Sequence, residues 1–275
     1  MPENTETTPY HITVRGVDLS STETGDTLKS LYAVLNRYAA LDLSGCTGNT
    51  IPSITGKAGA NKPYITAIIL PETVTVLEKK AFFGYAALTS VKMPKVKIIA
   101  PEAFDSLAKL QSVDMPEVES IEVGTAGNGA FYKCTALTSV SLPKATAIGD
   151  YAFSGCTSLS SASLPKAESI GDSAFSACEQ LSEISFPNAV SIGNRAFYGC
   201  KLLASVTAPK VTSIGSQAFQ NCGLTTITLG ATPPAIENNT FTNSKPPKFF
   251  VPVGALEAYK NSNVWSNLKD KITAI

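Results

Sequence analysis

Residues 137–158 read Leu137-Thr-Ser-Val-Ser-Leu-Pro-Lys-Ala-Thr-Ala-Ile-Gly-Asp-Tyr-Ala-Phe-Ser-Gly-Cys156-Thr-Ser158. Close copies of this stretch begin at Leu159 and Leu181. Its phenylalanine recurs at positions 82, 104, 131, 153, 175, 197, 219 and 241, so six of the seven steps are 22 residues and one is 27. A fixed period in the twenties is typical of a solenoid, in which each copy forms one coil that stacks on the next.

Each copy predicts the path of one coil. Val140-Ser-Leu142 alternates inward and outward side chains, which indicates a short strand. Pro143 has no amide hydrogen to donate and marks the strand end. Ile148 then points inward and Gly149 permits a tight bend. The last part, with Ala152, Phe153 and Cys156 facing the core, suits one short helical turn.

The segment before the repeats predicts a different kind of structure. After a disordered leader, Tyr10–Arg15 alternates like a strand. A helix is expected from Asp26 to Tyr38, and it is the natural cap for an open solenoid end. Leu41–Cys46 resembles a degenerate first coil, and Thr47–Lys62 is expected to be a loop before regular coils begin at Ile65.

The repeat pattern stops after Phe241. Phe249–Gly254 predicts a closing strand, Ala255–Lys260 a helix, and Trp265, the chain's single tryptophan, a packing residue over the last coil. The chain is therefore divided into an N-terminal leader, strand, capping helix and degenerate first coil (1–63), an array of about eight coils of 22–23 residues (64–245) and a C-terminal cap (246–275).

Five cysteines repeat at the same step of 22 residues, at positions 134, 156, 178, 200 and 222. Metal binding needs convergent thiolates with short Cys-to-Cys spacing, which this row lacks. Disulfides need facing Cβ atoms, whereas neighbours in a row point the same way. Catalysis needs a partner base, and the single histidine is His11. We therefore predict small buried thiols that fill the core.

Composition excludes several classes of partner. Charged residues make up 16% of the 275 residues and the formal net charge is zero, so no electrostatic footprint for nucleic acid or anionic membrane is present. No apolar run reaches the ~18–20 residues that span a bilayer. The start lacks the layout of a signal peptide. Either the protein is cytosolic, or a signal segment is missing from this sequence, and we favour the second.

The repeating unit Leu-x-x-Val-x-Leu-Pro-x-Ala-x-x-Ile-Gly-x-x-Ala-Phe-x-Gly-Cys resembles the BspA-type, or Treponema pallidum type, leucine-rich repeat over residues 65–245. The resemblance implies an α+β repeat solenoid, a right-handed leucine-rich-repeat coil with short parallel strands on one face and a cap at each end. It also implies a secreted or cell-surface protein of gut or oral bacteria that acts in adhesion or protein binding. It carries over no cofactor and no catalytic residue.

Three sets of residues are candidates for contact with a partner. The first is the outward row of the strands, which is lined with small hydroxyls: Ser139, Ser141, Ser161, Ser163, Glu183, Ser185, Ser205 and Thr207. The second is a five-residue insertion within Glu122–Gly129, represented by Gly124 and Asn128, which we expect to form a protruding loop. The third is a group of tyrosines near that insertion: Tyr132, Tyr151 and Tyr198.

Four hypotheses for function follow from these observations. The leading hypothesis is a non-enzymatic, monomeric surface scaffold that binds a protein. A structural spacer and a glycan-binding module are the alternatives, although the strand row carries no aromatic ring on which a sugar could stack. An enzyme is least expected, because no Ser-His or Cys-His arrangement and no recurring carboxylate pair is present. No metal or cofactor is expected.

Overall fold

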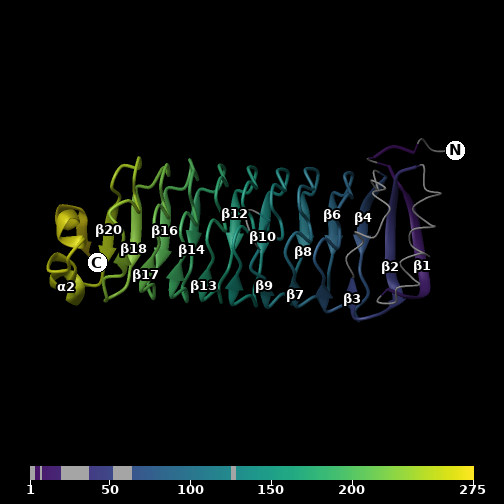
Figure 1. Cartoon of the computed structure of the whole chain (residues 1–275), viewed down its shortest axis with the longest axis horizontal. Coiled ribbons are helices and arrows are strands. Elements are labelled where there is room, and N and C mark those ends of the chain that lie inside the picture. The colour runs from purple at the N-terminus through teal and green to yellow at the C-terminus, as the bar shows by residue number, and fades with distance from the viewer. Residues whose placement is uncertain (1–3, 7, 20–36, 52–63, 125–127) are drawn as a thin grey trace.

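A computed structural model describes residues 4–6, 8–19, 37–51, 64–124 and 128–275. Its coils lie side by side along an elongated molecule, with the two ends of the chain at opposite ends (Figure 1). Equivalent strands of successive coils pair in parallel, so that Ile148 lies opposite Ile170 and Ile170 opposite Ile192. The repeat solenoid that the sequence predicts is confirmed.

The strands predicted from the alternating pattern form one side of the molecule. One five-stranded sheet contains β1 (Tyr10–Asp18), β2 (Ala39–Thr47), β4 (Ile65–Ile69), β6 (Ser90–Lys92) and β8 (Ser112–Asp114). β10 (Ser139–Ser141) pairs with β12 (Ser161–Ser163). A further five-stranded sheet contains β14 (Glu183–Ser185), β16 (Ser205–Ala208), β18 (Thr226–Leu229), β20 (Lys248–Val251) and β21 (Ile272–Ala274). We call this side the strand face.

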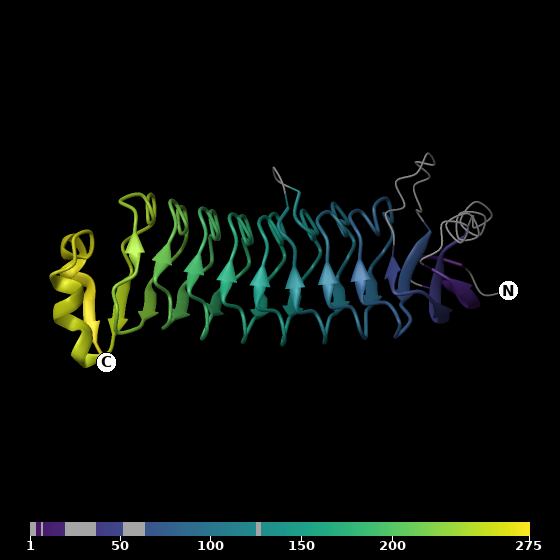
Figure 2. The same ribbon diagram turned by 60° about the horizontal axis from the view of Figure 1, so that its bottom comes forward.

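A second, nine-stranded sheet covers another side of the coils, so the prediction of strands on one face is incomplete. Its strands, in spatial order, are β19 (Ala235–Ile236), β17 (Ser213–Ile214), β15 (Ser191–Ile192), β13 (Ser169–Ile170), β11 (Ala147–Ile148), β9 (Ser120–Ile121), β7 (Ile98–Ile99), β5 (Val76–Leu77) and β3 (Thr50–Ile51). Figure 2 shows the successive coils and their strands side by side along the molecule. Strands of two residues show no alternation, which is why the sequence pattern does not reveal them.

The backbone after each of these short strands approaches the previous coil closely. The amide of Gly149 donates a hydrogen bond to the carbonyl of Ile121, at 2.9 Å. A Cβ atom at Gly149 would lie 2.3 Å from the carbonyl oxygen of Glu122, so no larger residue fits without a backbone shift. The glycine is therefore required by close packing of successive coils as well as by the bend.

The segment from Tyr151 to Cys156 forms successive turns instead of the expected helical turn. Tyr151 and Gly155 adopt left-handed backbone conformations, with φ of +56° and +78°. Two such residues within five positions interrupt a right-handed helix. Ala152, Phe153 and Cys156 nevertheless all face the core and are fully buried, as the sequence predicts.

Two rows of side chains run through the core along the molecule. The repeating phenylalanines stack with ring centroids 4.7–5.8 Å apart and interplanar angles of 2–18°. The cysteines of the repeats are unpaired and buried, which confirms their interpretation as core thiols. Each donates its S–H to the carbonyl of the phenylalanine of the previous coil, for example Cys178 to Phe153 at 3.3 Å. The separation is 25 residues, except for Cys134, which reaches Phe104 across the insertion and lies 30 residues from it.

The N-terminal segment differs in part from expectation. The strand predicted at Tyr10–Arg15 extends through Tyr10–Asp18 and pairs in parallel with β2, the expected first coil. The helix expected from Asp26 to Tyr38 lies outside the described residues, apart from its last two positions. Within the loop expected at Thr47–Lys62, Thr50 and Ile51 instead form β3, and residues 52–63 lie outside the described part.

The C-terminal segment packs against the last coils. It consists of β20, the 3-10 helix η1 (Val253–Ala255), α2 (Leu256–Lys260), the 3-10 helix η2 (Trp265–Lys271) and β21. The Trp265 ring is buried against Phe249 and Tyr259, and its Nε1–H donates to the carbonyl of Pro234 at 2.7 Å. Within the described ranges, no helix combines the length and apolar content needed to cross a membrane.

Candidate functional site

The hydroxyl residues predicted from the sequence gather on the strand face. Ser139 lies opposite Ser161 and Ser141 opposite Ser163. Glu183 lies opposite Ser205 and Ser185 opposite Thr207 in the next pair of strands. Each strand carries two of these residues, separated by one residue whose side chain points inward. The eight side chains therefore face outward from β10, β12, β14 and β16.

Six of these eight residues line a shallow cavity of about 540 Å³. They are Ser161, Ser163, Glu183, Ser185, Ser205 and Thr207. Ser139 and Ser141 lie on the adjacent strand, outside the lining. The cavity offers hydroxyl groups and one carboxylate, and no aromatic ring.

The insertion is described only at its two ends. Gly124 is buried and approaches Asn128 closely, because a Cβ atom on Gly124 would lie 2.4 Å from the Asn128 carbonyl oxygen. Residues 125–127 lie outside the described part, so the protruding loop stays a prediction.

The three candidate tyrosines occupy separate places on the turns. Tyr132 and Tyr151 are half-buried on successive coils, whereas Tyr198 is exposed two coils further on. The ammonium of Lys133 lies 5.0 Å from the centroid of the Tyr132 ring. Among the ring contacts of the described residues, none joins two of these tyrosines. A single aromatic anchor built from all three is therefore not formed.

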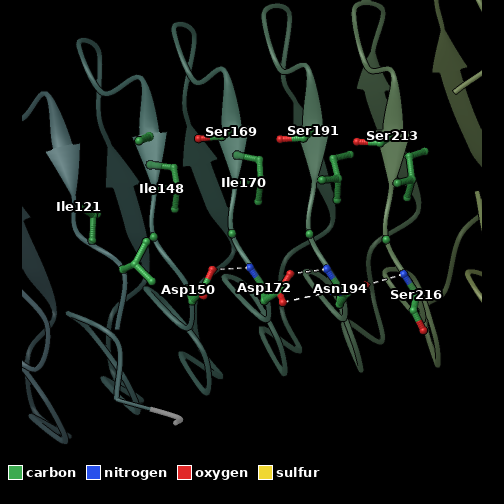
Figure 3. Close-up of a pocket in the computed structure, with 18 of the residues that line it drawn as sticks. Ile121, Ile148, Asp150, Ser169, Ile170, Asp172, Ser191, Asn194, Ser213 and Ser216 are labelled. Atoms are coloured by element: carbon green, nitrogen blue, oxygen red, sulfur yellow. Dashed lines mark hydrogen bonds between the residues drawn. The ribbon is translucent and has the colours of Figure 1, made fainter. Parts of the chain in front are cut away.

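A second and more extended hollow lies over the nine-stranded sheet, and the sequence reasoning missed it. We call it the groove. Its volume is about 980 Å³ and it extends across six coils, from β9 to β19. Figure 3 shows the aligned rows along it, with Ser169, Ser191 and Ser213 in one row and Asp150, Asp172, Asn194 and Ser216 in another. One feature of the sequence could have revealed the groove: a serine or alanine precedes the inward isoleucine in each of the six coils.

A ladder of side chains forms one edge of the groove. Asp150 Oδ1 accepts a hydrogen bond from the Asp172 amide at 2.8 Å, and Asp172 Oδ1 accepts one from the Asn194 amide at 2.7 Å (Figure 3). Asn194 Oδ1 accepts in turn from the Ser216 amide at 2.9 Å. Each side chain thus satisfies a backbone amide of the next coil. Both a carboxylate and a neutral amide accept such a bond in this ladder.

The buried titratable groups are structural. Burial raises the pKa of the Cys156 thiol to about 12, which removes the thiolate that nucleophilic or metal chemistry would need. Glu102 is buried and pairs with Lys79 and Lys80 at 3.0 and 3.2 Å. Burial opposes its ionisation, but the hydrogen bonds from the two lysines outweigh burial and lower the pKa of Glu102. In the described part of the chain, no three His, Cys, Asp or Glu residues are grouped to hold a metal ion.

A family model agrees with this repeat geometry. The model of the BspA type leucine rich repeat region, present in six copies, matches residues 52–144 and 124–248. The chain belongs to the BspA-type leucine-rich repeat family. The resemblance derived from the repeat unit is thereby confirmed. None of the curated proteins matches the chain.

Comparison with solved structures finds bacterial leucine-rich repeat proteins, one of which shares this fold. A leucine-rich repeat protein from Bacteroides ovatus is 24% identical, with a TM-score of 0.60 over 88% of this chain. The match covers 63% of the Bacteroides ovatus protein, so this chain spans less than two thirds of its length. The Treponema pallidum leucine rich repeat protein is 24% identical over 75% of this chain and 82% of its own, with a TM-score of 0.41.

Proposed function

We propose that this BspA-type protein is a non-enzymatic binding scaffold, located at the bacterial cell surface or outside the cell, that acts in adhesion or protein–protein interaction. The observation that carries the proposal is the groove of about 980 Å³, open along six coils above a core whose side chains are fully packed. Solenoids commonly bind partners on such extended surfaces.

The chemistry of the two open surfaces supports binding rather than catalysis. Their lining consists mainly of serine, threonine and aliphatic residues, with isolated carboxylates. The five repeat cysteines are committed to the core, and the single histidine, His11, lies on β1, whereas the groove begins at β9. In the described part of the chain, no hydrogen bond joins a serine or threonine hydroxyl of either lining to a histidine or a carboxylate.

A structural spacer is the second candidate. The observation that favours it is the elongated stack of coils itself (Figure 1), which separates the two ends of the molecule without needing a ligand. A spacer needs no particular residue on either sheet surface.

A binding screen separates the two. The purified chain is tested against immobilised extracellular-matrix proteins and against a glycan array, each at low and high salt. A saturable protein hit supports the scaffold. A glycan hit without a protein hit overturns protein binding and favours glycan capture. No binding at high micromolar concentration overturns the scaffold and leaves the spacer.

A further inference from the structure

We propose that the groove binds an extended, basic segment of a partner protein, with lysine or arginine side chains directed at its carboxylates. This inference rests on the proposed scaffold function and assigns the chemistry of its partner. It is carried by the charge of the groove, its length and the size of its lining side chains.

The groove carries unneutralised charge of one sign. Four carboxylates line it, on Glu122, Asp150, Asp172 and Glu237, and the lining contains no lysine or arginine. None of the four takes part in an ion pair among the described residues. Six glutamates elsewhere do, each with a lysine at 2.5–3.3 Å.

This separation of charge favours a cationic partner. The chain as a whole has a net charge of zero, so the groove is an acidic region on a neutral protein. A hollow lined by charges of one sign concentrates the field and raises the local concentration of ions of opposite sign. Glu122 and Glu237 are exposed and Asp150 and Asp172 half-buried, so all four carboxylates reach solvent.

The length of the groove matches a short extended peptide. Six coils at ~4.8 Å per strand give ~24 Å from the first to the last, which is the length of about seven extended residues at ~3.3 Å each. The carboxylates lie on the first three coils and the sixth. Asn194 and Ser216 take the position of Asp150 and Asp172 on the fourth and fifth coils, whereas Glu122 and Glu237 directly follow the isoleucines of theirs. A matching segment therefore concentrates its basic side chains toward the Glu122 end.

The lining permits close approach of a polypeptide and is poorly suited to other ligands. The outward side chains of the six strands are serine or alanine, so nothing bulky rises between the walls. At the Glu122 end, Val123 is 62% exposed and adds an apolar contact for an aliphatic stem. No aromatic ring is available for a sugar to stack on, and the carboxylates repel nucleic acid.

The test measures binding of the whole chain to a labelled peptide by fluorescence anisotropy. The probe is an eight-residue peptide that alternates lysine and serine, with a neutral fluorophore. The matched control peptide has glutamate at each lysine position. We expect the lysine peptide to bind at least tenfold more tightly than the glutamate peptide, and to weaken at least tenfold from about 0.02 to about 0.5 M salt, because salt shortens the range of electrostatic attraction.

A neutralised variant assigns the binding to the groove. Glu122→Gln, Asp150→Asn, Asp172→Asn and Glu237→Gln together remove the charge and keep one oxygen on each side chain. The ladder is expected to survive, because Asn194 already holds the Ser216 amide through a neutral amide. We expect at least tenfold weaker binding by this variant. The control Glu72→Gln removes an exposed carboxylate that lines neither surface and should leave binding unchanged.

Three results would overturn the proposal: equal binding by wild type and the neutralised variant, equal binding of the two peptides, or spermine binding as tightly as the lysine peptide. A circular-dichroism melt shows whether the neutralised variant is folded. If that variant is not folded, the test is repeated with the single variant Glu122→Gln, which changes an exposed position. A further outcome separates this inference from the proposed function. If the lysine peptide does not bind, while a matrix protein binds wild type and the neutralised variant equally, then the groove does not bind basic segments, but the protein is still a binding scaffold. No binding in either experiment refutes both.

Discussion

The buried cysteine row predicts that the protein loses stability at alkaline pH. The test removes one thiol, with Cys156→Ser, and compares how the free energy of unfolding depends on pH. Serine cannot ionise in this range and can still donate to the Phe131 carbonyl, as Cys156 does at 3.2 Å. Ser244 already occupies the equivalent place in a later coil, where it donates to the Phe219 carbonyl at 2.7 Å.

The magnitude follows from the difference in thiol pKa between the folded and unfolded states. Burial raises the pKa of Cys156 from its ordinary value of 9.0 to about 12, so the folded state holds this proton more tightly than the unfolded state. The resulting stability is fully present below pH 9 and is lost as pH rises toward 12. Between these limits the thiol costs ~1.4 kcal/mol per pH unit, or ~2 kcal/mol by pH 10.5.

Urea unfolding at pH 7.0, 9.0 and 10.5, in the presence of a reductant, measures this difference. The free energy of unfolding of wild type should fall more steeply above pH 9 than that of the variant, with a gap in slope of ~1.4 kcal/mol per pH unit. All other ionisable groups are the same in the two proteins and cancel in the comparison. Parallel curves for the two proteins would refute the assignment of a buried, protonated thiol.

Three further predictions concern stability. Phe175→Ala should lower the free energy of unfolding by ~3–5 kcal/mol in urea, because its fully buried ring stacks between two others, whereas the half-buried Phe241 should cost less when truncated. Ala177→Gly should raise the free energy of unfolding by about 1 kcal/mol, and with it the melting temperature, because Ala177 adopts a left-handed conformation with φ of +58°. An unchanged or lower melting temperature would contradict this. Trp265→Phe should cost ~1–3 kcal/mol, measured by urea unfolding, because the Pro234 carbonyl loses its buried donor; a neutral effect would count against that contact.

The sequence predicts the stacked core well, because the core depends on side chains that recur at one fixed step. Phe153 and Cys156 are both fully buried as expected, and the rows they belong to follow from the period of 22 residues. Stacking of similar coils turns a position in the repeat into a row in space, so each row follows from the sequence alone.

The second sheet could not be derived from the same pattern. Ala147 and Ile148 form a strand of two residues, which is too short to show alternation. Gly149 was interpreted as a bend, and its contact with Glu122 of the previous coil depends on how closely the coils stack. Since the groove lies over this sheet, its acidic lining also escaped the sequence reasoning. The helical turn that the sequence predicts at Tyr151 is also wrong. The spacing of apolar residues does not reveal a positive φ, which Tyr151 adopts.

The most direct test of binding through the groove blocks one surface at a time. Ser169→Gln with Ser191→Gln fills the groove, whereas Ser161→Gln with Ser163→Gln fills the cavity on the strand face. Both pairs are tested beside wild type against a matrix protein recovered in the binding screen. Binding through the groove predicts that the groove variant loses at least tenfold in affinity and that the strand-face variant binds like wild type. Unchanged binding by the groove variant would contradict it.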